Sequence, residues 1–195
     1  MPTKYVPGTN MPYAGFADSS PCGITGGMFS LFRPMIRAAN GLSLGQVCAI
    51  TGLEVSTIQN WVKRGFVARP VKKKYHERQL ARILLIAALR DCMKIDQIGE
   101  LMGLINGDTD DESDDIISED QLYDDLCEAV RLMDDGHTAR EEIAAVIRQV
   151  TAGYRGPDEG ARRRLETALQ VMLCAYLSAK LKQEADLCFM QLKAE

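Results

Sequence analysis

The pattern of apolar and polar residues predicts a chain built from helices, preceded by an irregular segment of about forty residues. Residues 1–40 are rich in glycine, serine and methionine, and five prolines interrupt any long helix there. We expect an N-terminal arm with one short amphipathic helix over residues 28–39. The arm either contacts DNA or a second copy of the chain, or lies as a strap on the body. The apolar positions of its helix are Met28, Phe29, Phe32, Met35 and Ile36.

Two short helices are predicted directly after the arm. Ser43 and Gln46 have the spacing of a capping box, and the helix that they begin ends near Gly52. A second helix begins around Val55 and ends at Gly65, with apolar residues at a period of about 3.6. Because the connection between them is short and contains glycine, the pair is typical of a helix-turn-helix. Polar residues that could contact bases or phosphates form the outer face of the second helix: Ser56, Gln59, Asn60, Lys63 and Arg64.

An extended basic segment over residues 66–75 follows the second helix and predicts a short wing. Its cations and its aromatic residue are suited to a track of phosphates. Helices over residues 76–93 and 96–102 come next, and the run 83–89 is apolar all round, which predicts burial on two sides. The candidate phosphate contacts of the wing are Arg69, Lys72, Lys73, Lys74 and Tyr75.

The last third of the chain also reads as helical. Ser118–Gln121 and Thr138–Glu141 have capping-box spacing and head helices that end near residues 135 and 153. A final helix follows Pro157, runs to about Leu192 and would be about 50 Å long. Its apolar stripe is either a dimer interface or the face of a central core helix. The stripe consists of Leu165, Leu169, Met172, Leu173, Tyr176 and Leu177.

The net charge of −4 conceals a strong asymmetry along the chain. Residues 41–95 contain ten Lys/Arg and three Asp/Glu, whereas residues 96–135 contain fifteen acids and one arginine. Because charges in solution are screened over about 8–10 Å, the local positive charge decides whether the first of these segments suits a nucleic acid. We therefore predict four parts: an arm (1–40), a DNA-binding domain (41–105), an acidic linker (106–118) and a C-terminal helical domain (119–195).

The acidic linker admits three interpretations. Its carboxylates fall at positions of a calcium-binding loop, but Ser113 stands where that loop needs glycine and Asp115 where it needs an apolar residue. A solvated linker is favoured, because like charges at this density repel one another. In the third interpretation the run docks on Lys72–Lys74 and competes with DNA.

Composition argues against membrane insertion, secretion and catalysis. The longest nearly apolar run, residues 171–179, is about half of the ~20 residues needed to cross a bilayer, and the N-terminus has no apolar signal segment. Six dispersed cysteines without a C-x-x-C pair indicate reduced, mostly buried thiols in a cytoplasm. His76 and His137 have no evident nucleophile or metal partner, and no glycine-rich phosphate loop is present. We expect no enzyme activity, metal or cofactor.

The order of these signals resembles the MerR-type winged helix-turn-helix over about 60 residues. The resemblance rests on Thr51-Gly52-Leu53 at the turn, Thr57–Trp61 in the second helix, Lys63-Arg64-Gly65 after it, Tyr75 in the wing and Lys94–Ile98 at the start of a later helix. Gln59 stands where that family has an arginine, and the wing is shorter. The whole chain is also similar to an uncharacterised bacterial family, a domain of unknown function with a MerR-like N-terminal half.

The expected fold class is therefore mainly α, with a MerR-like helix-turn-helix, a short wing and a C-terminal helical domain. The resemblance implies a DNA-binding transcriptional regulator that binds double-stranded DNA as a homodimer and responds to a small-molecule effector. The alternative is a protein-interaction or structural module that uses the same fold without binding DNA. Recombination directionality is a third role for such modules, although the large C-terminal body exceeds what such small proteins need.

Overall fold

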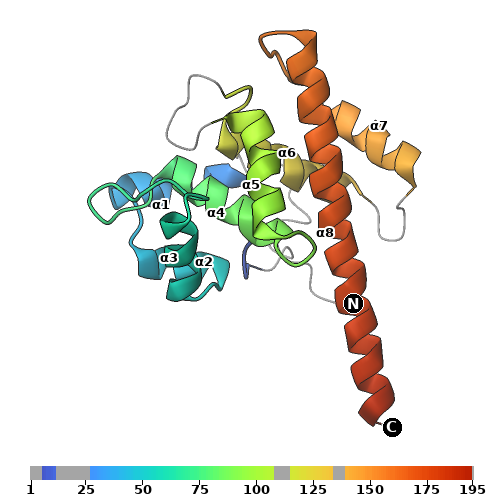
Figure 1. The fold of residues 1–195 in the computed structure, drawn as a ribbon, viewed down its shortest axis with the longest axis horizontal. Helices are drawn as coiled ribbons and strands as arrows, with labels where there is room; N and C mark the ends of the chain where they lie inside the picture. The colour runs from blue at the N-terminus through green and yellow to red at the C-terminus, as the bar shows by residue number, and fades with distance from the viewer. Residues whose placement is uncertain (1–5, 12–26, 108–114, 134–138, 195) are drawn as a thin grey trace.

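Eight α-helices and two short 3-10 helices form the regular structure of the described part of the chain, which comprises residues 6–11, 27–107, 115–133 and 139–194 of this computed structural model (Figure 1). No strand occurs among these residues, so the expected mainly α class is confirmed. The elements in chain order are η2 (Met28–Leu31), α1 (Arg33–Ala38), α2 (Leu44–Thr51), α3 (Val55–Lys63), α4 (Glu77–Leu89), α5 (Ile95–Asn106), α6 (Glu119–Leu132), α7 (Arg140–Val150), η3 (Thr151–Gly153) and α8 (Glu159–Ala194).

Helix α4 is the centre of the molecule. It packs against α2, α5, α6 and α8, and nearly all of its residues are buried, as the apolar run 83–89 predicts. Burial of such a helix on several sides is favourable because it removes a large apolar surface from water. One hydrophobic cluster extends from Val6 through α2, α3 and α4 to Tyr176 on α8. The α2–α3 pair and the C-terminal helices therefore share a core.

The helix starts follow local capping signals at Ser43, His76 and Lys94 and depart from them before α6 and α7. The Ser43 hydroxyl accepts a hydrogen bond from the Gln46 amide, and the Gln46 side chain accepts one from the Ser43 amide, so this capping box is confirmed. Ser118 precedes α6 without a side-chain capping bond, so the capping box predicted there is wrong; Glu119 instead points inward to Arg82. Ala139 is the residue before α7, and Thr138 lies outside the described residues.

Helices α4 and α5 differ in length from the predicted 76–93 and 96–102. His76 heads α4 as predicted, where its amide donates to the Gln79 side chain at 2.9 Å, but the helix ends at Leu89. Lys94 begins α5 because its amide donates to Gln97 Oε1 at 3.1 Å. The helix continues to Asn106 because its last turn is buried against the body.

Residues 6–11 form a strap on the body, which is one of the two roles expected for the N-terminal arm. Val6 is buried, and the Tyr123 hydroxyl on α6 donates to the Pro7 carbonyl at 2.7 Å. The Asn10 amide donates to the Ile50 carbonyl at the end of α2 at 3.2 Å. This short segment thus joins α2 and α6. The expected short helix of the arm is also present, as η2 and α1.

Gly8 allows the strap to lie against α4. Its φ is +70°, and a Cβ there would lie 2.1 Å from the backbone oxygen of Leu84. We expect Gly8→Ala to lower the free energy of unfolding by about 2 kcal/mol or more, because the left-handed backbone and the contact with a backbone atom both resist a side chain. The matched control is Gly45→Ala in α2, where an added Cβ meets no atom within 4 Å. Equal urea midpoints for Gly8→Ala and Gly45→Ala would contradict the prediction.

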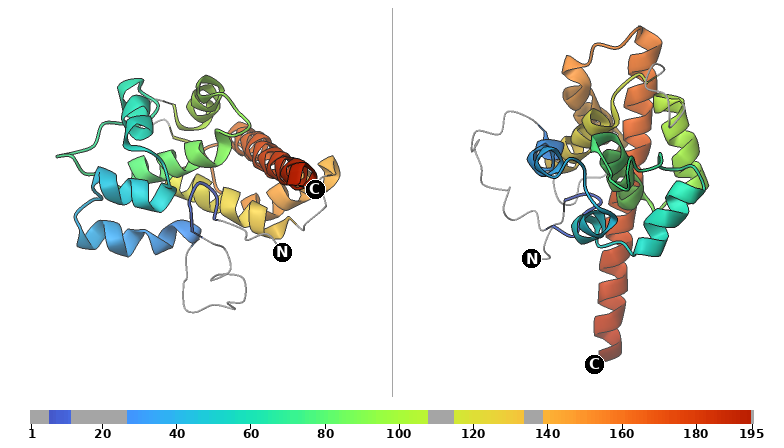
Figure 2. Two further views of the ribbon diagram at one scale, coloured as in Figure 1. Left: turned by 90° about the horizontal axis from the view of Figure 1, so that it is seen from below. Right: turned by 90° about the vertical axis from the view of Figure 1, so that its left-hand side faces the viewer.

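Helix α8 is a core helix along its first half and extends beyond the body along its second half (Figures 1 and 2). Leu165, Leu169, Met172 and Leu173 are buried, so within this chain the predicted stripe serves as a core face. Every described side chain from Leu181 to Lys193 is exposed. The helix is simply longer than the body is wide, at about 1.5 Å per residue.

The cysteines contradict the expectation of mostly buried thiols. Cys127 is buried in α6, whereas Cys92, Cys174 and Cys188 are exposed and Cys48 is half-buried. Cys174 is exposed because it lies on the side of α8 away from the core, and Cys188 because it lies on the half of α8 that projects beyond the body. Among the described residues, no helix is long and apolar enough to cross a membrane.

Candidate nucleic-acid interface

Helices α2 and α3 meet through a three-residue turn. Gly52 adopts φ +70°, and its amide donates to the Cys48 carbonyl at 2.8 Å, which ends α2 in the left-handed geometry that glycine favours. Leu53 is buried next to it, and Thr51 caps the turn through its hydroxyl. Helix α3 then places Ile58 and Trp61 in the core. These anchors fix which side of α3 faces outward.

The outer side of α3 is polar and exposed along its whole length. At about 100° per residue the five predicted positions share one face, and every one of them is exposed in the structure. The amide side chains stand in the middle of the helix and the cations at its C-terminal end. This outer face of α3 consists of Ser56, Gln59, Asn60, Lys63 and Arg64.

Arg64 differs from the other members because its guanidinium already has partners. Its Nη2 lies 2.7 Å from Asp96 Oδ1 on α5, and its Cζ lies 4.7 Å from the centroid of the Phe66 ring. Both side chains of the ion pair are well exposed, so the pair contributes little to stability. The Arg64 guanidinium is therefore already paired, and a phosphate that bound it would compete with Asp96.

A basic tip, defined as residues 71–74, lies beside the start of α2. Val71 and Lys74 pair across a two-residue turn in which Lys72 and Lys73 both have positive φ, +50° and +63°. At its base, Leu42 and Tyr75 exchange two backbone hydrogen bonds of 2.8 Å each. The segment predicted as a wing thus forms a very short hairpin. Because Tyr75 pairs with Leu42, the base of this hairpin is held next to the start of α2.

Tyr75 does not belong to the interface. Its side chain is 3% exposed, because pairing with Leu42 turns the ring into the core, so its prediction as a DNA contact is corrected. Arg69 is exposed, and its carbonyl accepts a hydrogen bond from Gln79 Nε2 at 3.4 Å. The base of the tip is therefore joined to the start of α2, and α2 packs against α3, with Arg69 on the segment between α3 and the tip.

The cations of this surface are mostly unneutralised. Among the described residues, no ion pair joins Lys63, Arg69 or the three tip lysines to a carboxylate. The acidic segment 108–114 lies outside the described residues, and with it the calcium and docking interpretations. Asp115, just after it, pairs with Arg78 on α4 at 3.5 Å. In the described part of the chain, no group of three or more potential ligands could hold a metal ion.

A buried ion pair between Arg82 and Glu119 lies next to the backbone just after α3, and it was not predicted from the sequence. Arg82 on α4 donates through Nε to the Phe66 carbonyl at 3.1 Å and places Nη1 2.9 Å from Glu119 Oε1 on α6. Both side chains are almost fully buried. The isolated charge within the apolar run around Arg82 was the signal that could have revealed it. The pair links the backbone just after α3 to the C-terminal helices.

Burial has the largest effect on the pKa values of Glu119 and Arg82. Desolvation raises the pKa of the Glu119 carboxyl to about 7, although Arg82 and Arg78 act in the opposite direction. Desolvation likewise lowers the pKa of Arg82, against the attraction of Glu119. Arg78 Nε lies 3.4 Å from Glu119 Oε2, so a second guanidinium faces the same carboxylate.

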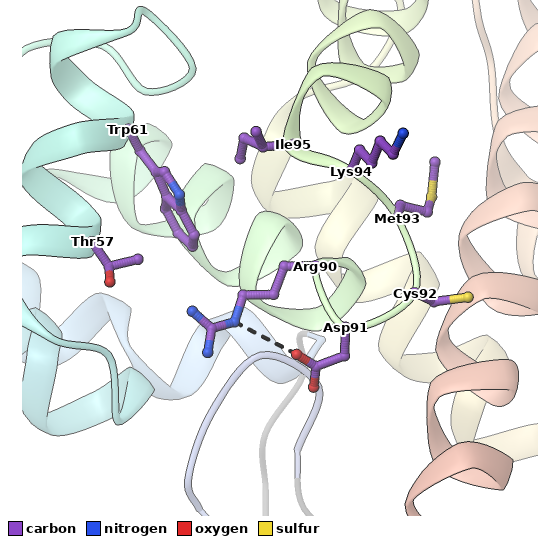
Figure 3. Close-up of a pocket in the computed structure, with 8 residues that line it drawn as sticks. All are labelled: Thr57, Trp61, Arg90, Asp91, Cys92, Met93, Lys94 and Ile95. Atoms are coloured by element: carbon purple, nitrogen blue, oxygen red, sulfur yellow. Dashed lines mark ion pairs between the residues drawn. The ribbon is translucent and has the colours of Figure 1, made fainter.

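An open hollow of about 420 Å³ adjoins α3 on its other side (Figure 3). Thr57 and Trp61 of α3 face the turn between α4 and α5, where Arg90 and Asp91 form an ion pair of 3.7 Å. The rest of the lining comes from residues 92–95. A small molecule bound there would touch the helix that carries the outer face.

Comparisons with known proteins give two matches. Residues 42–126, less than half of the chain, match DUF1836, a domain of unknown function. A stretch of 121 residues, 58% of this chain, is 26% identical to the uncharacterised protein YkrK of Bacillus subtilis (strain 168). That stretch covers 52% of YkrK, so the chain spans about half the length of this relative. No solved structure matches the chain.

The DUF1836 match begins at Leu42, the residue that pairs with Tyr75, and ends within α6, beyond Glu119. It therefore includes the α2–α3 pair, the basic tip and the Arg82–Glu119 ion pair. Neither match describes an activity or a helix-turn-helix of the MerR type. Together the two matches support an uncharacterised family, to whose domain of unknown function residues 42–126 are similar.

Proposed function

We propose that this protein is a DNA-binding transcriptional regulator that binds double-stranded DNA as a homodimer in the cytoplasm. The observation that carries the proposal is the exposed polar face of α3, set over buried Ile58 and Trp61, in a helix pair whose first helix begins next to a tip of three lysines. A helix of this kind, joined by a tight turn to the helix before it, fits the major groove.

Each part of the surface has a role that follows from its chemistry. Gln59 and Asn60 can bond the edge of an adenine in the major groove, and Ser56 can bond either kind of base pair. Lys63 reaches guanine or phosphate from the end of the same helix. The basic tip, Arg69 and Arg64 contact phosphates. Such contacts fix the position of the protein on the DNA without reading the base sequence.

The backbone of the basic tip supports a role for its lysines. Lys72 and Lys73 occupy two left-handed positions where Asn-Gly is the favoured pair, and a residue with a Cβ is disfavoured there by about 1 kcal/mol. Local strain of this kind concentrates at functional sites. A role of their charges in binding would explain why two adjacent lysines occupy this unfavourable backbone conformation.

The direct test is binding of the purified protein to fragments of DNA from around its own gene, followed by gel shift or fluorescence anisotropy. We expect a shift at low salt and a steep loss of affinity as salt rises, because each neutralised phosphate adds about 0.9 to the slope of log affinity against log salt. Folded protein that shifts no genomic fragment at low salt would remove the proposal.

Two sets of substitutions should separate sequence reading from phosphate contact. Gln59→Ala and Asn60→Ala should each cost about 1–3 kcal/mol on the preferred site and alter the base preference. Lys72/Lys73/Lys74→Ala should weaken all sequences alike and reduce the salt slope by about 2.7. The control is Arg148→Ala on α7, an exposed cation away from this surface. Binding to panels of site variants at several salt concentrations measures both effects, and equal losses for all variants would contradict the assignment.

A small-molecule effector belongs to the same proposal. A small molecule bound in the hollow of Figure 3 would contact α3, since Thr57 and Trp61 line it. The competing function, a protein-interaction module without DNA binding, is favoured by the exposed apolar end of α8. A folded chain that binds a protein partner and no DNA would establish that alternative.

A further inference from the structure

The end of α8 exposes more large apolar side chains than any other described part of the molecule. Beyond Lys180 the helix leaves the body, on the side away from α2 and α3 (Figures 1 and 2). Such a surface on a single helix calls for a partner, because it leaves a large apolar area in water. The exposed large apolar residues of this end are Leu181, Leu187, Phe189, Met190 and Leu192.

Two of these residues, Leu181 and Leu192, belong to an outer stripe on α8. Six positions follow one another at steps of three or four and lie within about 80° of one another, given about 100° per residue. The stripe lies on the side of α8 opposite the core residues Leu165 and Leu169. All of its members are exposed except Leu177, which is half-buried. The outer stripe consists of Cys174, Leu177, Leu181, Ala185, Cys188 and Leu192.

Five of the six positions are symmetrical about Leu181. Small or apolar residues stand four and seven positions away in both directions, as an isologous two-fold interface requires, whereas Leu192 has Gln170 as its counterpart. In an antiparallel pair with Leu181 on the axis, Cys174 faces Cys188 of the second copy, and Leu177 faces Ala185 of the second copy. We propose that a second copy of this chain docks antiparallel on the outer stripe of α8, with Leu181 on the two-fold axis.

The charges beside the stripe agree with this pairing. Lys180 and Glu184 lie on the same flank of α8, and the two-fold axis brings Glu184 of one copy close to Lys180 of the other. On the opposite flank, Lys182 Nζ is 2.5 Å from Asp186 Oδ2 of its own helix, so its charge is already balanced. Opposite charges at such flanking positions fix orientation between paired helices.

A hollow at the inner end of the stripe completes the match. It has a volume of about 490 Å³, lies between α7 and α8, and is lined by Arg140, Ile143, Gln170, Val171 and Cys174. The antiparallel pairing brings Phe189 and Leu192 of the second copy to Val171 and Gln170. The exposed Phe189 ring of each copy thus meets the apolar hollow between α7 and α8 of the other copy. This reciprocity favours a second copy over an unrelated protein.

The inference deepens the proposed function, since it specifies how the homodimer forms, and it can fail separately. A monomer that binds DNA would overturn the inference and leave DNA binding in place. A dimer of the expected register that binds no DNA would leave the inference in place and remove the proposed function.

The first experiment measures mass in solution by sedimentation velocity across protein concentration. We expect the 21.6 kDa chain to sediment as a dimer, and Leu181→Asp to raise the dissociation constant by at least about tenfold, because two like charges then meet on the axis. Leu181 is 62% exposed, so the substitution leaves the fold of the monomer intact. The matched control is Met190→Asp, at a site that is 63% exposed on the opposite side of the same helix. A monomeric wild type, or equal weakening by both substitutions, would overturn the proposal.

The second experiment tests the direction of pairing with a short bis-maleimide, in a background with Cys22→Ser and Cys92→Ser. We expect cross-linked dimers in that background and none with Cys174→Ser or Cys188→Ser alone. Co-expression of the two variants should restore cross-linking, up to about half of the yield, because only mixed dimers hold one facing thiol pair. A parallel pair would place like residues opposite each other, so each single variant would still cross-link. That outcome would overturn the antiparallel register.

Discussion

Replacement of Arg82 by methionine is expected to destabilise the protein by about 3–5 kcal/mol, the loss seen when one partner of a buried ion pair is removed. Methionine keeps most of the apolar stem, so the change acts mainly on the charge. It leaves the Glu119 carboxylate in the core without the guanidinium that lies 2.9 Å away, and the Phe66 carbonyl without its donor. Urea denaturation followed by circular dichroism measures the effect.

The dependence on pH makes this prediction specific. The folded pKa of Glu119, about 7, lies above its ordinary value of 4.5, so the folded state keeps a proton that the unfolded state releases between these values. Stability from this group is therefore full below about pH 4.5 and is lost as the pH rises through 7. Removal of Arg82 raises the folded pKa further. The loss from Arg82→Met should thus be larger at about pH 8 than at about pH 5.

The control for this experiment is the double variant Arg82→Met/Glu119→Gln. It removes the buried carboxylate, which Arg78 alone still faces in the single variant, while keeping the shape of the side chain. It should therefore be more stable than Arg82→Met at about pH 8 and should lose the difference between the two pH values. If the single variant were as stable as wild type at about pH 8, the pair would not hold α4, α6 and the segment after α3 together.

Replacement of Lys72-Lys73 by Asn-Gly is expected to move stability and DNA binding in opposite directions. Both lysines have positive φ, and Asn-Gly is the pair that such a two-residue turn favours. The variant should therefore be more stable by about 1 kcal/mol. It also removes two cations, so the salt slope of DNA binding should fall by about 1.8 and the affinity at physiological salt by about tenfold or more. Thermal denaturation and anisotropy titrations measure the two effects.

The matched control is Lys72→Arg/Lys73→Arg, which keeps both charges and both left-handed side chains. It should resemble wild type in stability and in DNA binding, so that the two variants separate the effect of charge from that of backbone strain. A more stable Asn-Gly variant that binds DNA as tightly as wild type would remove the basic tip from the interface.

The α2–α3 helix pair could be predicted from sequence because its signals are local. Ser43 caps α2 through a residue only three positions away, and Gly52 ends it by its own backbone conformation. The buried Ile58 and Trp61 then fix the outer face of α3, because helical spacing alone decides which residues lie opposite them. Four of the five wing candidates also remain at the surface or near it.

Tertiary packing decided the rest. Tyr75 is buried because it pairs with Leu42, and no pattern around either residue reveals that partner. Arg82 and Glu119 are 37 positions apart and meet only because α4 and α6 cross in the core. The sequence by itself determined the α2–α3 pair, the caps at Ser43 and Gly52 and the polar face of α3, since these depend on neighbours within one or two turns. The tertiary structure decided which part of α8 is core and which part projects, because that depends on where the other helices end.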